Sequence, residues 1–162
     1  MGTPILLTED PASAPAPQAH GLTLLIVDDD PFMRALLCDI LEPEGYPIAS
    51  AASASDAIAI IAAGGVGVIV CDQCMPLTPG TAFFERARQL APACYRIMLT
   101  AMDDDAVLRR AEQRGDIERR LGKPFDGAVL RAAVADGFRI ATRRMRALAA
   151  PTFKEEPRWP KN

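Results

Sequence analysis

The chain has 162 residues, 49% hydrophobic and 24% charged, which fits one globular domain of about 120 to 130 residues with tails and leaves no room for a separate output domain. The net charge of −3 and the sequence pI near 5.2 argue against a chain that binds nucleic acid through its overall charge. No apolar run reaches the roughly 18 residues that span a bilayer, and no basic segment at the N-terminus leads into an apolar one, so we expect a cytoplasmic location.

The chain begins with a segment that favours disorder, because prolines lie among Ala, Ser and Thr throughout residues 1–21. From residue 22, short apolar runs alternate with helical periodicity up to residue 149, and a proline-rich tail, 150–162, follows. The expected pairs of strand and helix are 22–27 with 32–41, 46–51 with 53–63, 66–71 with 83–90, 96–100 with 104–114, and 117–121 with 126–149.

Five such repeats predict an α/β fold: a doubly wound, five-stranded parallel sheet with helices on both faces, as in flavodoxin-like proteins. Run 66–71 is almost wholly apolar and is therefore expected to be a central strand. Ser53 and Asp56 form a capping-box arrangement at a helix start. Helix 104–114 has a thin apolar face and should be loosely held. The apolar residues at helical spacing are, helix by helix, Phe32, Leu36, Leu37, Ile40 and Leu41; Phe83, Phe84, Ala87 and Leu90; Val107, Leu108 and Ala111; and Val129, Leu130, Ala133, Val134, Phe138, Ala141 and Met145.

The four cysteines leave a redox or zinc site as an alternative, since Cys71 and Cys74 form a Cys-x-x-Cys motif. A second ligand pair is missing, however, and the single histidine, His20, lies in the N-terminal tail. Partly buried free thiols in a reducing compartment are the preferred interpretation.

Polar residues end the apolar runs at one edge of the predicted sheet, where doubly wound folds place their ligands. Asp28 and Asp29 end the first run, Asp72 the third and Thr100 the fourth, while Lys123 follows the fifth. Three crowded carboxylates require a cation, and Mg²⁺ prefers such oxygen ligands. The pattern predicts phosphoryl transfer to Asp72, with positive charge from Lys123 and a hydroxyl donor from Thr100.

Four motifs carry a resemblance to a known family. They are Leu-Ile-Val-Asp-Asp-Asp-Pro-Phe-Met-Arg at 25–34, Cys-Asp-Gln-Cys-Met-Pro at 71–76 with Gly80 following, Leu-Thr-Ala at 99–101, and Lys-Pro-Phe at 123–125. In order and spacing they closely resemble the receiver domains of bacterial two-component response regulators, including the stand-alone chemotaxis regulators. The resemblance covers roughly residues 22–145.

The resemblance implies that Asp72 is the phosphoacceptor. It also implies that Asp29 and Asp72 bind Mg²⁺ directly, that Asp28 acts mainly through water, and that Cys74 supplies its backbone carbonyl to the metal. Thr100 and Lys123 would then contact the phosphoryl group.

A receiver is a signalling switch rather than a conventional enzyme. The resemblance implies a sensor histidine kinase or histidine phosphotransfer protein as donor, loss of the phosphoryl group by water attack, and an unknown downstream protein as partner. A homodimer is an open alternative, and we expect neither membrane nor nucleic acid as a partner.

Several charged residues have a structural interpretation that we prefer. Asp30 before Pro31 is expected to cap a helix, and acidic residues 103–105 to complement the start of the next one. Four arginines near the end of the last helix are expected to form a solvated basic face: Arg139, Arg143, Arg144 and Arg146.

One position departs from the family pattern. Receivers usually carry Tyr or Phe three residues before the lysine, where this chain has Arg120. Because a guanidinium resists burial, we expect Arg120 to stay exposed or to pair with an acidic group. Two alternatives to a stand-alone switch remain: the receiver portion of a longer regulator, and an interaction module that works without phosphorylation.

Overall fold

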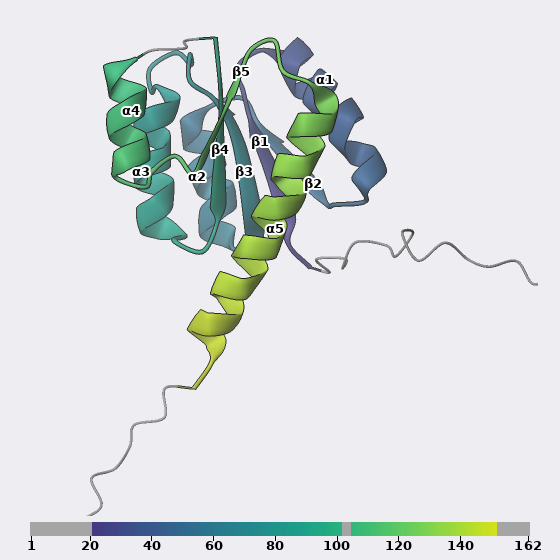
Figure 1. Ribbon diagram of the computed structural model, residues 1–162, viewed down its shortest axis with the longest axis vertical. Helices are drawn as coiled ribbons and strands as arrows, with labels where there is room; N and C mark the ends of the chain where they lie inside the picture. Colours follow the sequence, from purple (N-terminus) through teal and green to yellow (C-terminus); the bar gives the residue numbers. More distant parts are fainter. Residues whose placement is uncertain (1–20, 102–104, 152–162) are drawn as a thin grey trace, which may run out of the picture.

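The computed structural model describes residues 21–101 and 105–151, and Figure 1 shows their arrangement. The strands are β1 (Thr23–Val27), β2 (Ile48–Ala51), β3 (Val66–Asp72), β4 (Tyr95–Thr100) and β5 (Arg119–Gly122). The helices are α1 (Pro31–Leu41), a 3-10 turn η1 (Glu42–Glu44), α2 (Ala54–Ala63), α3 (Gly80–Leu90), α4 (Ala106–Gln113) and α5 (Gly127–Ala149).

The five strands form one parallel sheet in the order β2-β1-β3-β4-β5, which confirms the predicted fold class. Strand order reverses between β1 and β3, so the carboxyl ends of these two strands are neighbours. The edge at which doubly wound folds bind their ligands is therefore formed by the segments that follow Val27 and Cys71.

The sheet separates two apolar cores, because successive strand residues point to opposite faces. Leu24 and Ile26 of β1 pack toward α1 and α5, whereas Leu25 and Val27 pack toward α2, α3 and α4. Every residue of β3 is buried, as the apolar run predicted for a central strand.

The predicted helix caps are confirmed where the structure describes them. Ser53 accepts a hydrogen bond from the Asp56 amide at 3.1 Å, and Asp30 accepts one from the Phe32 amide at 2.9 Å. Asp105 caps α4 through the Val107 amide at 2.6 Å. Residues 103 and 104, the other expected helix-start acids, lie outside the described residues, as do residues 1–20 and 152–162 of the two predicted tails.

Two predicted strand starts are wrong. The second strand begins at Ile48 rather than residue 46, because Tyr46 stacks on Phe138 of α5 with ring centroids 4.2 Å apart. The fifth begins at Arg119 rather than residue 117, because the Ile117 amide still points back to the end of α4. Tyr46 and Ile117 were predicted to be strand residues because they are apolar. Side-chain packing holds Tyr46 outside its strand, and a helix-ending turn holds Ile117 outside its own.

Most residues of the predicted apolar helix faces are buried, but five of them are exposed, and for these five the prediction is wrong. In α1 the core-facing positions are Leu37 and Leu41, whereas Phe32 is 86% and Leu36 is 48% exposed. Both pairs keep a spacing of four residues, so periodicity alone could not choose between the two faces. The others are Leu90, Val107 and Val129, which are 42%, 49% and 45% exposed.

α4 has a narrow apolar face, as predicted. Leu108 and Ala111 are its buried residues.

α5 has 23 residues, and its last turns extend beyond the lower edge of the sheet in Figure 1. None of the helices among the described residues is long and apolar enough to cross a membrane.

Candidate functional site

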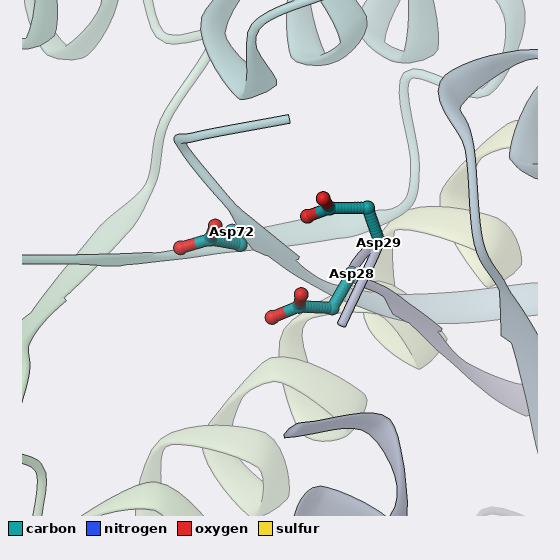
Figure 2. Close-up of side chains that lie close together, drawn as sticks. All are labelled: Asp28, Asp29 and Asp72. Atoms are coloured by element: carbon teal, nitrogen blue, oxygen red, sulfur yellow. The ribbon is translucent and has the colours of Figure 1, made fainter. Parts of the chain in front are cut away.

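Three carboxylates meet where the strand order reverses. Asp28 and Asp29 follow the last residue of β1, and Asp72 is the last residue of β3. Each offers an oxygen within 4.8 Å of the others, and Figure 2 shows their side chains projecting to the same side of the sheet edge. The sequence prediction that these three residues come together is confirmed.

Asp28 is the most constrained of the three, with 2% of the residue exposed. Its Oδ1 accepts the Asp30 amide at 2.9 Å, while its Oδ2 is buried without a hydrogen-bond partner among the described residues. Burial raises the pKa of Asp28, and the charges of Asp72 and Asp29 add to that rise, whereas the Asp30 amide and Lys123 oppose it. A buried carboxylate oxygen without a partner is a position where a cation would bind favourably.

One cation of the chain already enters the cluster. Lys123 Nζ lies 2.8 Å from Asp72 Oδ1, with the lysine side chain 24% and the aspartate side chain 10% exposed. The Lys123 amide donates to the Thr100 carbonyl at 2.8 Å, which fixes the segment after β5 against the end of β4. The peptide bond between Lys123 and Pro124 is cis.

The other two predicted site residues lie at the same edge. Thr100 is the last residue of β4, 1% exposed, and is paired in register with Gly122. Cys74 is exposed in the loop that follows Asp72. The structure thus places every predicted site residue at the carboxyl ends of the strands or in the segments that follow them.

Two further residues shape the site, and sequence reasoning missed both. Arg34 Nη1 donates to the carbonyls of Asp28 at 2.7 Å and Asp29 at 3.3 Å, which ties the acidic segment to the second turn of α1. Gln73, next to Asp72, is buried and hydrogen-bonded to Thr81 of α3. No sequence signal points to Gln73, whereas the arginine lies within the 25–34 motif and could have been considered.

The donor set suits a hard divalent ion. Three carboxylates with one lysine leave excess negative charge in a confined space, and all side-chain ligands are oxygens, which Mg²⁺ prefers over nitrogen or sulfur. The unpartnered Asp28 Oδ2 fits the same interpretation. Asp28, Asp29 and Asp72 are the residues that could hold such an ion.

The cysteines do not form an alternative metal site. Within residues 21–101 and 105–151, the acidic triad is the group of three or more potential ligands, and it contains no cysteine. Cys71 and Cys94 are buried free thiols, and burial raises the pKa of both, to about 11 for Cys94. These protonated thiols are core residues, as we preferred from the sequence.

Arg120 pairs with an acidic group, which confirms one of the two outcomes expected for it. Its Nε lies 3.2 Å from Glu112 Oε1 of α4, and its side chain is 27% exposed. Its Nη1 is buried and has no hydrogen-bond partner in the described part of the chain. Arg120 therefore links β5 to α4 through charge.

A sequence model of the response regulator receiver domain matches residues 24–135. The chain belongs to this family. Both edges of the match lie within the described domain, and it includes all the residues of the site. The fold agrees, since the receiver domains among solved structures share the five-stranded parallel sheet.

The curated relatives of this receiver are longer proteins. It is 31% identical to the C4-dicarboxylate transport transcriptional regulatory protein DctD of Rhizobium meliloti over 64% of the chain and 22% of that protein. It is 33% identical to the transcriptional regulatory protein TcrA of Mycobacterium tuberculosis over 67% of the chain and 43% of that protein. The chain thus spans about a fifth to two fifths of these two relatives.

Solved structures match over nearly their whole length. A signal receiver domain of an HD domain-containing protein from Pseudomonas fluorescens Pf-5 is 26% identical, with a TM-score of 0.71, over 75% of this chain and 98% of that chain. A structure titled adenylate cyclase, from Rhodopirellula baltica, is 27% identical, with a TM-score of 0.73, over 80% and 98%.

Proposed function

We propose that this receiver accepts a phosphoryl group on Asp72 and that Mg²⁺ supports the transfer. The observation that carries the proposal is the acidic triad at the reversal of strand order, with Lys123 Nζ 2.8 Å from Asp72 Oδ1. If the cluster had only a structural role, each buried oxygen of Asp28 would be expected to have a hydrogen-bond partner, and Oδ2 has none among the described residues. The arrangement is suited to binding both a divalent ion and a phosphoryl group.

In the proposed reaction, a carboxylate oxygen of Asp72 attacks phosphorus, a P–O bond forms, and the bond from phosphorus to the donor nitrogen breaks. The leaving imidazole keeps the electron pair of that bond. Lys123 orients the Asp72 carboxylate beforehand and contributes positive charge next to the transferred group. Thr100, at the end of β4, supplies a hydroxyl to the phosphoryl oxygens.

Asp28, Asp29 and Asp72 would hold the ion together with the backbone carbonyl of Cys74. The bound ion would neutralise negative charge on the transferred group. Asp29, the exposed member, is suited to direct ligation, whereas the buried Asp28 is suited to fixing the position of the ion through water.

The donor in this proposal is a sensor histidine kinase or a histidine phosphotransfer protein in the cytoplasm. Phosphorylation then biases the loops at the carboxyl ends and α4 between two arrangements, which a separate protein reads. The buried residues of α4 are Leu108 and Ala111, so a movement of this helix would expose little apolar surface. A second copy of the chain is one candidate for the protein that binds the phosphorylated form.

A second candidate places this receiver within a longer regulator. The curated relatives favour it, since the chain covers 22% of DctD and 43% of TcrA, both named as transcriptional regulatory proteins. The 23-residue α5 would then serve as the connection to an output domain. The reading frame of the native gene distinguishes this candidate from a separate switch, and the chemistry at Asp72 is the same in both.

The chemistry is tested by incubating the protein with Mg²⁺ and an acyl phosphate, followed by intact-mass measurement. We expect a gain of one phosphoryl group that hydroxylamine removes, and no gain in Asp72→Asn or with a chelator. Asp136→Asn, an exposed aspartate on α5, is the matched control and should be phosphorylated like wild type. An unmodified wild-type protein, or an undiminished gain in Asp72→Asn, would overturn the proposed mechanism.

A further inference from the structure

We propose that Gln73 is a positioning residue for the acidic site: it joins the end of β3 to the start of α3 and so fixes Asp72 and the loop after it for metal binding. This inference rests on the proposed function, since it concerns the same site. Gln73 is not among the residues proposed to hold the ion or the phosphoryl group. It acts through the backbone on either side of it.

The first turn of α3 needs hydrogen-bond acceptors that its own cap does not supply. Pro79 is the N-cap and makes no side-chain capping bond. The Gln73 carbonyl accepts the Gly80 amide at 3.0 Å, and Gln73 Oε1 accepts the Thr81 amide at 2.9 Å. The residue after the acceptor aspartate therefore caps the next helix.

Gln73 is also buried, which is unusual for its type. It is 8% exposed and Thr81 is 5% exposed. Gln73 Nε2 lies 3.4 Å from Thr81 Oγ1, so both ends of the side-chain amide have a partner on one residue of α3. A buried amide satisfied in this way holds one orientation, because releasing it leaves buried polar groups unpaired.

The same residue is bound to the neighbouring strand and to the loop. The Gln73 amide donates to the Leu99 carbonyl at 3.1 Å, which extends the pairing of β3 with β4 beyond Asp72. The Met75 amide donates to the Gln73 carbonyl at 3.2 Å. Cys74 lies between these two residues, so the direction of its carbonyl is set within this hydrogen-bonded turn.

α3 begins very close to the acceptor backbone. A Cβ atom added to Gly80 would lie 2.5 Å from the Asp72 carbonyl oxygen and 3.0 Å from the Gln73 Cα. The peptide after Asp72 is therefore confined between β4 on one side and the first turn of α3 on the other. Gln73 supplies the hydrogen bonds that keep the helix in that place.

This arrangement matters for the metal more than for the chemical step. An ion such as Mg²⁺ demands near-ideal octahedral positions, so small displacements of its ligands weaken binding. Once bound at saturating concentration, the ion restores the ligand positions itself. Loss of the Gln73 contacts should therefore raise the dissociation constant of the metal while the rate of phosphorylation at saturating metal changes little.

The test is a titration of the metal-free protein with Mn²⁺, an oxygen-binding divalent ion whose free form is followed by electron paramagnetic resonance. Gln73→Met keeps a similar volume and removes the side-chain hydrogen bonds. We expect its dissociation constant to rise about tenfold, as for other groups that orient metal ligands, with the saturated phosphorylation rate within about twofold of wild type. Gln89→Met, an exposed position on α3, is the matched control and should bind like wild type.

The outcomes separate the two proposals. The proposed function is overturned if wild type binds no Mn²⁺, or if Asp29→Asn binds Mn²⁺ as tightly as wild type does. Carboxylate-dependent binding with the same dissociation constant in Gln73→Met overturns only the role of Gln73. If Gln73→Met does not fold, Thr81→Val decides: it removes one hydroxyl, and a dissociation constant raised about threefold supports the role whereas an unchanged one overturns it.

Discussion

The amino ends of β4 and β5, opposite the candidate site, also gather buried charge, and there each carboxylate is neutralised. Two carboxylates are each held by two guanidinium groups: Asp116 by Arg88 and Arg114, and Glu118 by Arg96 and Arg144. At the carboxyl ends, three carboxylates share a single lysine. We call the first cluster balanced because each of its carboxylates has arginine partners, although its four guanidinium groups outnumber its two carboxylates, and we call the second cluster unbalanced.

The two clusters shift aspartate pKa values in opposite directions. At Asp116 burial works to raise the pKa, but the hydrogen bonds from Arg114 and Arg88 outweigh it and the pKa is lowered. At Asp28 burial and the neighbouring carboxylates prevail, and the pKa is raised. The balanced cluster stabilises the fold, whereas the unbalanced cluster carries excess negative charge that a bound cation would neutralise.

Breaking the balanced cluster should have the largest effect on stability. Asp116 is fully buried and accepts from Arg88 Nε at 2.6 Å and from Arg114 Nε at 2.8 Å. In Asp116→Asn the charge is lost and one guanidinium faces an amide NH₂. We expect the free energy of unfolding in urea to fall by about 2 kcal/mol, because the buried side chain loses its charge-assisted hydrogen bonds to two partly exposed arginines.

The exposed pair on α5 provides the control. Asp136 lies 2.7 Å from Arg139, with both side chains more than half exposed. Asp136→Asn removes the same charge and should change the free energy of unfolding by less than about 0.5 kcal/mol. Equal effects of the two substitutions would show that the buried cluster does not stabilise the fold.

The unbalanced cluster should respond in the opposite sense. In the absence of metal, Asp28→Asn removes a buried charge next to Asp72 and Asp29, so we expect the free energy of unfolding to rise by about 1 kcal/mol at neutral pH. The same variant should bind Mn²⁺ more weakly than wild type. A loss of stability on this substitution would contradict the interpretation of Asp28 as an unsatisfied charge.

The pH dependence of stability sharpens this contrast. Because the folded pKa of Asp28 is raised, protonation of Asp28 contributes stability that is fully present below about pH 4. This contribution is lost as pH rises through the folded pKa. Because the folded pKa of Asp116 is lowered, its contribution is present above about pH 4 and is lost as pH falls. Urea unfolding from pH 3 to 7 with a chelator should show the high-pH loss disappear in Asp28→Asn and the low-pH loss disappear in Asp116→Asn.

The sequence predicted the unbalanced cluster and missed the balanced one. Aspartates that end apolar runs can be read directly, because parallel strands place their carboxyl ends side by side. The partners of Asp116 come from α3 and from the residue that follows α4, and nothing in the spacing of Arg88 or Arg114 shows that they converge. Contacts that depend on how two helices are oriented are fixed only by the packed fold.

The same limit explains the other errors. The predicted apolar face of the first helix included both Phe32 with Leu36 and Leu37 with Leu41, yet only Leu37 and Leu41 are buried, because the rotation of α1 is set by the sheet beneath it. Gln73 had no assigned role from the sequence, because its contacts depend on the approach of Gly80 to the backbone of Asp72. Position along a strand could be predicted, whereas the inner face of a helix could be predicted only in part.

The smallest expected effect on stability concerns Arg120, which joins β5 to α4 through an ion pair whose side chains are partly exposed. Its pair with Glu112 has side chains 27% and 34% exposed, so Arg120→Ala should lower the free energy of unfolding by less than about 1 kcal/mol. The local effect should be larger: hydrogen exchange of the α4 amides should accelerate, because the ion pair that links β5 to Glu112 of α4 is lost.

Arg119→Ala is the matched control, since Arg119 is the adjacent, exposed arginine of β5. It should leave the exchange of α4 unchanged. If Arg120 also carries the signal from the site, the change in α4 exchange that a phosphate mimic with Mg²⁺ causes in wild type should shrink in Arg120→Ala. An equal response in the two proteins would exclude a special role for the guanidinium and leave Thr100 and the loops as the route by which phosphorylation reaches α4.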